Sequence, residues 1–112
     1  SWANFPADRQ RFFELLQASP TIPTVIISGD THWSEFSRID DAGLPFALVE
    51  MTSSGLTEEW HAISPNRHRV GEAFAVANYG LLEIDWTADA PVLDMSIRDE
   101  RGTTLLQQTV RF

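Results

Sequence analysis

The chain contains no cysteine and no lysine, and it has no long apolar run. Without cysteine, neither disulfides nor thiolate metal sites can form. No stretch approaches the roughly twenty apolar residues that a membrane helix needs, so no membrane span is predicted. Cationic groups are also scarce, and the net charge is −8. This balance argues against a nucleic-acid partner, because neutralising phosphates requires a basic patch.

The first residues, Ser1-Trp2-Ala3-Asn4, lack an initiator methionine and the charged and apolar regions of a signal peptide. We therefore expect either a piece of a longer protein or a processed terminus. A length of 112 residues with 43% hydrophobic content suits one domain with a real core. Residues 1–112 are accordingly predicted to form a single domain, itself part of a longer one.

Periodicity predicts one α-helix followed mainly by β-structure. The helix begins at Pro6, which suits a first helical turn, and it ends before Pro20. Its apolar face should consist of Phe5, Phe12, Phe13, Leu15 and Leu16. Strands are predicted at residues 24–28, 46–52, 79–86, 92–98 and 104–112. The pattern over residues 33–39 is too short to assign. The polar residues 57–75 show no period, and long irregular segments of this kind are often functional.

The last three strands should form an antiparallel meander, with the final hairpin closed at residues 99–102. Alternation predicts three inward-facing sets: Leu82, Ile84 and Trp86; Leu93, Met95 and Ile97; and Leu106, Val110 and Phe112. A helix, a strand and then this meander are typical of a layered α+β or α/β domain.

The most informative motif is Gly29-Asp30-Thr31-His32, directly after the strand at residues 24–28. Ligand sites of open α/β sheets lie just beyond the carboxyl ends of strands. Asp30 and His32 could present a carboxylate and an imidazole to two adjacent metal ions. The alternative makes Asp30 the N-cap of a short helix and His32 an incidental loop residue.

Other candidates are weaker. Glu35 either orients the imidazole of His32 through a hydrogen bond or is a solvated helix carboxylate. His61 and His68 are loop histidines, for which simple exposure is the commoner outcome. Further possibilities are a phosphate held by the planar guanidinium groups of Arg67 and Arg69, and a site bordered by Trp33 and Trp60.

Four segments, in this order and spacing, resemble the C-terminal part of the alkaline phosphatase D-like enzymes, in the calcineurin-like metallophosphoesterase superfamily. They are Trp2 with Pro6-Ala7-Asp8-Arg9, then residues 25–32, residues 50–57 and residues 78–86. The resemblance covers nearly the whole chain. It implies a β-sandwich of two sheets flanked by helices, and a phosphatase or phosphodiesterase that uses two divalent metal ions.

By that resemblance, Asp30 would bind one metal and His32 the other, with Asp30 at a position where the wider superfamily usually has histidine. The metals would hold a hydroxide that attacks phosphorus in line with the leaving group. Residues 57–75 would border the pocket for the phosphate ester. Family members are commonly exported, which implies a periplasmic or cell-surface location.

The family's other ligand motifs, an Asp-x-His, a Gly-Asp-x-x-Asp, an Asn with a catalytic His and a further His, are absent from this sequence. The chain alone is therefore expected not to bind both metals and not to catalyse, and its partner would be the missing N-terminal part of the same protein. The alternative is a non-catalytic, β-rich interaction module in which Gly29–His32 is an ordinary turn.

Overall fold

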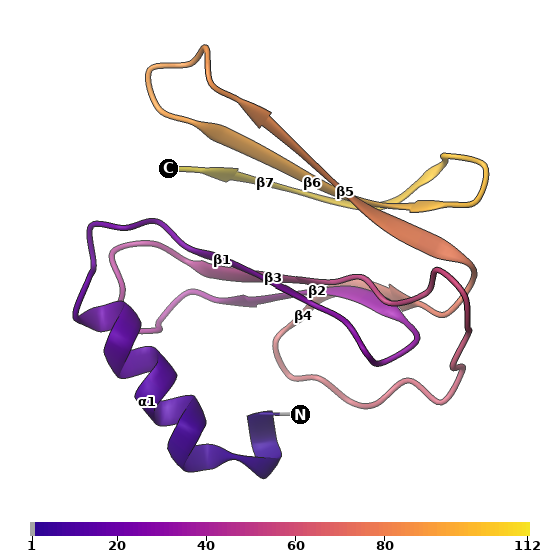
Figure 1. The fold of residues 1–112 in the computed structure, drawn as a ribbon, viewed down its shortest axis with the longest axis horizontal. Helices are drawn as coiled ribbons and strands as arrows, with labels where there is room; N and C mark the ends of the chain where they lie inside the picture. Colours follow the sequence, from indigo (N-terminus) through magenta and orange to yellow (C-terminus); the bar gives the residue numbers. More distant parts are fainter. Residues whose placement is uncertain (1) are drawn as a thin grey trace.

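The computed structural model describes residues 2–112 and contains two β-sheets and one α-helix (Figure 1). The helical elements are η1 (Trp2–Asn4), a 3-10 turn, and α1 (Pro6–Gln17). The strands are β1 (Val25–Ser28), β2 (Ser34–Ile39), β3 (Leu48–Thr52), β4 (Arg69–Phe74), β5 (Asn78–Asp85), β6 (Val92–Asp99) and β7 (Thr104–Arg111). Within residues 2–112, no helix is both long enough and apolar enough to cross a membrane.

The strands divide into a mixed sheet and an antiparallel one. Sheet A has the order β1-β3-β2-β4, with β1 parallel to β3 and the other pairs antiparallel. Sheet B is the meander β5-β6-β7. The predicted three-strand meander is therefore confirmed, as is a β-rich domain with two sheets. The closing turn is confirmed too, since the Gly102 N–H donates to the Asp99 carbonyl oxygen at 2.9 Å with Gly102 at φ +82°.

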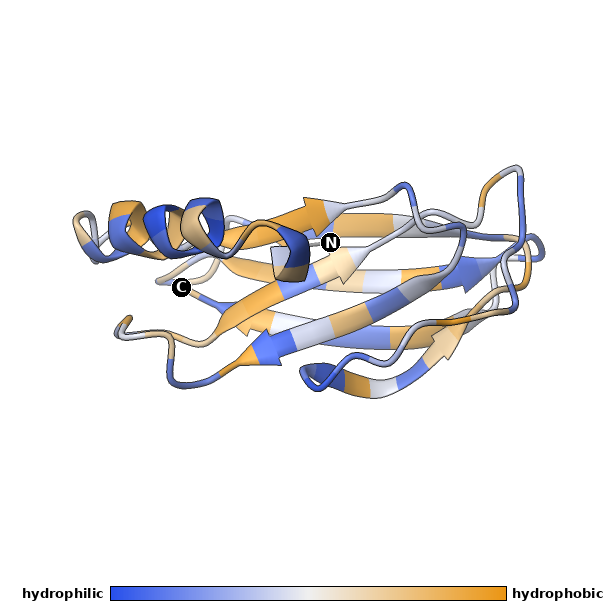
Figure 2. Ribbon diagram, turned by 90° about the horizontal axis from the view of Figure 1, so that it is seen from below, coloured by the Kyte–Doolittle hydropathy of each residue, from blue (hydrophilic) through white to orange (hydrophobic). Residues whose placement is uncertain are grey.

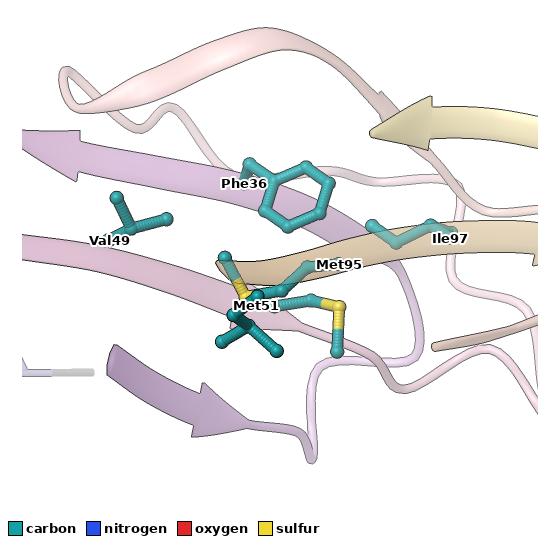
Figure 3. Packing of buried hydrophobic residues seen from close by; sticks show 6 residues of the cluster. Phe36, Val49, Met51, Met95 and Ile97 are labelled. Atoms are coloured by element: carbon teal, nitrogen blue, oxygen red, sulfur yellow. The ribbon is translucent and has the colours of Figure 1, made fainter. Parts of the chain in front are cut away.

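The core lies between the two sheets and draws on both (Figure 3). Sheet A contributes Phe36, Val49 and Met51, and sheet B contributes Leu93, Met95 and Ile97. Met95 and Ile97 are fully buried, which confirms the predicted inward set of β6. The predicted set of β7, Leu106, Val110 and Phe112, packs against this cluster while remaining half-buried.

The inward-facing residues predicted for β5 are not buried, so this prediction is wrong. Leu82, Ile84 and Trp86 are 38%, 47% and 73% exposed. Leu82 is paired with Met95 and Ile84 with Leu93, so both side chains are on the inner face of sheet B. They stay exposed because the β5–β6 hairpin rises away from sheet A toward its turn, and no strand of sheet A covers it there (Figure 1).

Helix α1 forms as predicted, but its apolar face is only partly covered, with Phe12, Phe13 and Leu16 half-buried. Pro6 is at its first position and Asp8 is in its first turn, where the helix dipole favours an acid. No residue of α1 is buried, and Leu15 is 63% exposed. Figure 2 shows α1 as a separate rod outside the sheets, with apolar and polar residues interleaved. A 2.9 Å hydrogen bond from Gln17 Nε2 to the Ala42 carbonyl oxygen connects the end of α1 to the loop before β3.

Two segments for which the sequence pattern predicts no secondary structure contain strands. The residues after Trp33 form β2, and part of the 57–75 segment forms β4. Alternation is hidden in β4 because Gly71 adopts φ +73° and the register with β2 shifts between Glu35 and Phe36. Of the 57–75 segment, residues 57–68 and Ala75 lie outside the strand.

Candidate functional site

The Gly29–His32 turn links the end of β1 to the start of β2 with an unusual backbone. Asp30 has φ +74° and His32 has φ +60°, both in the left-handed region. Residues other than glycine rarely adopt this conformation, although Asp and His are among those that tolerate it best. Two such residues in one four-residue turn persist only when the surroundings hold them.

Contacts from two distant segments hold the turn. The His32 N–H donates to Ser54 Oγ at 3.1 Å, and the His32 carbonyl oxygen accepts from the Trp60 N–H at 2.9 Å. The turn is thus fixed from one side by the loop after β3 and from the other by the irregular residues 57–68. These bonds determine the direction in which the imidazole leaves the backbone.

A buried network of hydrogen bonds holds the loop after β3, which carries Ser54. The Ser54 N–H donates to Ser34 Oγ at 3.0 Å, and Ser34 Oγ donates to Asn78 Oδ1 at 2.6 Å. Ser34 and Asn78 are 0% and 2% exposed. The Asn78 N–H closes the network on the Gly55 carbonyl oxygen at 3.0 Å, and a Cβ at Gly55 would collide with the Asn78 amide. The first residues of β2 and β5 therefore position the site.

The imidazole of His32 pairs with Glu58, with 3.1 Å between Nδ1 and Oε2. The two side chains are 40% and 69% exposed. A carboxylate that accepts from Nδ1–H leaves Nε2 with its lone pair available, which is the arrangement found around metal-binding histidines. Sequence reasoning missed Glu58. The signal available was only the acidic pair Glu58-Glu59 in the polar segment.

Asp30 is exposed in the same turn as His32. The N-cap alternative is wrong, because strand β2 follows the turn and no helix does. Among residues 2–112, no three His, Asp or Glu side chains gather closely enough to hold a metal ion. Asp30 and His32 are therefore two candidate ligands without a third from the described part of the chain.

Glu35 has neither of the roles predicted for it. It lies in a strand, its side chain is 7% exposed, and it does not approach His32. Its Oε2 accepts from Nε of Arg69 at 2.6 Å and lies 2.6 Å from Nη2 of the same guanidinium group, and its Oε1 accepts from Asn66 Nδ2 at 2.6 Å. The carboxylate thus joins β2 to β4 and to the end of the irregular segment. Arg69 pairs with Glu35 and Arg67 donates to His68, and a phosphate held by these two residues stays a prediction.

The other two histidines are not part of the Gly29–His32 turn, although His61 directly follows Trp60. His61 is 73% exposed and its Nε2 is 3.3 Å from Glu59 Oε2. His68 lines an open crevice of about 410 Å³ beside α1, together with Arg9 and Arg67. Burial, followed by the positive charges of Arg67 and Arg9, lowers the pKa of His68. A neutral imidazole agrees with Nε2 accepting from Arg67 Nε at 3.0 Å.

The two tryptophans proposed to border a site differ. Trp60 is 54% exposed and adjoins the turn through its backbone. Trp33, directly after the turn, is half-buried.

No protein-family model, curated protein or solved structure matches this chain.

Proposed function

We propose that the chain is the C-terminal part of a two-metal phosphatase or phosphodiesterase of the alkaline phosphatase D-like type, with Asp30 and His32 each contributing one metal ligand. The proposal rests on the segments that resemble that family and on the local geometry of the turn. The fold would then be part of a metallophosphoesterase sandwich, and the missing N-terminal part of the same protein would supply the remaining ligands.

The observation that carries the proposal is the pairing of His32 with Glu58. An incidental loop histidine has no need of a left-handed backbone that is held from two sides. Here Nδ1 of His32 lies 3.1 Å from Oε2 of Glu58, and the backbone hydrogen bonds to Ser54 and Trp60 hold the backbone of His32. A carboxylate beside one ring nitrogen orients the imidazole, as is common for histidines that bind metal ions.

Asp30 suits the second role by chemistry and position. A carboxylate is a hard oxygen ligand, and the left-handed conformation at Asp30 and at His32 turns the chain sharply between them. Once bound, two divalent ions supply a nucleophile at neutral pH and stabilise charge on the phosphoryl oxygens. The chain's own residues orient the ligands, and the exposed residues 57–62 border the turn through Glu58 and Trp60.

The test is made in the protein encoded by the complete reading frame. His32→Ala and Asp30→Asn should each lower metal-dependent hydrolysis of p-nitrophenyl phosphate or its diester by at least about 100-fold, and should lower the bound metal measured by elemental analysis. His68→Ala is the control, since His68 lines the crevice beside α1 and not the turn. Full activity and full metal content in His32→Ala would remove the proposal and favour the non-catalytic module.

A further inference from the structure

The crevice beside α1 lies at the opposite end of β2 from the Gly29–His32 turn. β2 begins two residues after His32 and ends at Ile39, which lines the crevice. The strand alone spans roughly 16 Å, so the crevice is separate from the candidate metal ligands. The lining residues that bear on its chemistry are Arg9, Phe13, Ile39, Asp41, Arg67 and His68.

Two guanidinium groups reach this crevice from different elements. Arg9 comes from α1, and its guanidinium carbon lies 4.7 Å from the centre of the Phe13 ring. A cation–π contact uses the face of the ring and none of the guanidinium N–H donors. Arg67 comes from the segment before β4, and its Nε donates to Nε2 of His68 at 3.0 Å. Both side chains therefore retain N–H groups for a further acceptor.

Arg9 and Arg67 differ in their pairing from the other arginines that lie near acids. Arg38, Arg69 and Arg98 each have a carboxylate oxygen within 3.3 Å. Among residues 2–112, neither Arg9 nor Arg67 forms such an ion pair, although the chain has 16 acidic residues and 8 basic ones. Two guanidinium groups in one crevice without a carboxylate partner are suited to an anion from outside the chain.

The imidazole of His68 lies close to both positive charges. Burial, followed by the charges of Arg67 and Arg9, lowers the pKa of His68. Solvent and salt screen charges over short distances, so both guanidinium groups must be near the ring to have this effect. Asp41, on the loop between β2 and β3, also lines the crevice but is exposed. One exposed carboxylate offsets at most one of the two guanidinium charges, so the crevice remains positive.

We propose that this crevice binds the phosphate group of a small molecule, with phosphate oxygens accepting from the guanidinium groups of Arg9 and Arg67. The planar guanidinium fork matches a phosphate, and a dianion balances two such charges. The crevice has a volume of about 410 Å³, within the range of roughly 300–1,000 Å³ usual for small-molecule sites. An organic part of the ligand lies against Phe13 and Ile39. This binding goes beyond the proposed function, because no residue of the turn takes part in it.

Phosphonates test the crevice because they carry a phosphate-like charge and resist hydrolysis. Phenylphosphonate, inorganic phosphate and benzoate are titrated into the protein from the complete reading frame. The Cε1 proton of His68, identified by its loss in His68→Ala, is followed by NMR. Both phosphorus compounds should shift this signal saturably and raise the pKa of His68, because a nearby anion favours the protonated imidazole. Tighter binding of phenylphosphonate identifies an organic phosphate as the ligand, and tighter binding of inorganic phosphate identifies the free ion.

Charge variants test the role of each group. Arg9→Gln and Arg67→Gln should each weaken phenylphosphonate binding by at least about 10-fold, because each removes a charge-assisted hydrogen bond. Asp41→Asn should tighten it by about 2–5-fold, because it removes a repelling charge. Arg101→Gln is the control, since Arg101 is an exposed arginine in the β6–β7 turn, outside the crevice. A damaged fold cannot explain opposite changes in the arginine and aspartate variants.

Three results would overturn the inference. One is the absence of any saturable shift of the His68 signal with either phosphorus compound. Another is unchanged affinity in both Arg9→Gln and Arg67→Gln. The third is binding of benzoate as tight as that of phenylphosphonate. His32→Ala should leave binding at His68 unchanged, because the crevice does not include the turn. Phenylphosphonate binding at His68 in a protein without phosphoesterase activity would refute the proposed function and leave this inference intact.

Discussion

The Arg69→Met substitution is expected to destabilise the fold by about 3–5 kcal/mol, because it leaves the buried carboxylate of Glu35 without its cation. The Glu35 and Arg69 side chains are 7% and 22% exposed, and two guanidinium nitrogens contact the same carboxylate oxygen at 2.6 Å. After the substitution, Asn66 remains as a neutral donor to the other oxygen. Methionine preserves most of the volume, so the lost free energy reflects the stranded charge.

Urea denaturation followed by circular dichroism measures the effect. With a slope of about 1–3 kcal/mol per molar urea, the midpoint should fall by at least about 1 M. Arg98→Met is the control, since Arg98 meets Glu83 at 3.3 Å in a pair whose glutamate is 63% exposed. Such a surface pair contributes at most about 1 kcal/mol.

The double variant Glu35→Leu with Arg69→Met decides the mechanism. Removing both charges should recover much of the stability, because a buried ion pair is often no better than apolar groups of similar size. Equal midpoint shifts for Arg69→Met and Arg98→Met would refute the reasoning. A double variant as unstable as Arg69→Met would show that the guanidinium acts through packing or through its 2.7 Å bond to the Ser64 carbonyl oxygen.

Three further outcomes are expected. Met95→Ala should lower the free energy of unfolding by about 2–5 kcal/mol in the same assay, because Met95 is fully buried between the sheets. The pKa of Asp99 is lowered chiefly by the Thr103 backbone N–H. The ionised Asp99 therefore stabilises the folded state above the pKa that Asp99 has in the unfolded chain, near 4. That stabilisation is lost as the pH falls through the lower pKa of Asp99 in the folded state. Asp99→Asn should flatten the decline of the melting temperature below pH 4. In the longer protein, Glu58→Gln should weaken metal binding by about 10–100-fold in calorimetric titration, whereas Glu14→Gln on α1 should not.

Strong local patterns predicted the elements whose burial is regular. The alternation of β6 places Leu93, Met95 and Ile97 inward, and all three are buried, because β6 is the central strand of sheet B and is covered by sheet A. The same alternation in β5 placed Leu82 and Ile84 on the correct face but could not show that sheet A ends at β1. Burial depends on the neighbouring sheet, which the local pattern does not contain.

Elements determined by distant partners were missed for a related reason. β4 carries Gly71 at a positive φ and pairs with a shifted register, so its alternation is broken. The spacing of Glu35 three residues after His32 predicts either a partner for the imidazole or a solvated helix carboxylate. In a strand the side chains alternate between faces, and Glu35 is directed to Arg69 of the neighbouring strand.

The candidate site itself shows why a four-residue motif is a weak predictor alone. Gly29–His32 acquires its geometry from contacts more than twenty residues away: Ser54 on the backbone N–H of His32, Trp60 on its carbonyl oxygen and Glu58 on its imidazole. The segment that carries Glu58 and Trp60 is in turn fixed at its far end by Asn66, which donates to the buried Glu35. The stability of the fold and the geometry of the site are therefore coupled. A change that loosens the Glu35–Arg69 contact should also release Glu58 from His32. Arg69→Met should thus weaken metal binding in the longer protein, although Arg69 is not itself a ligand.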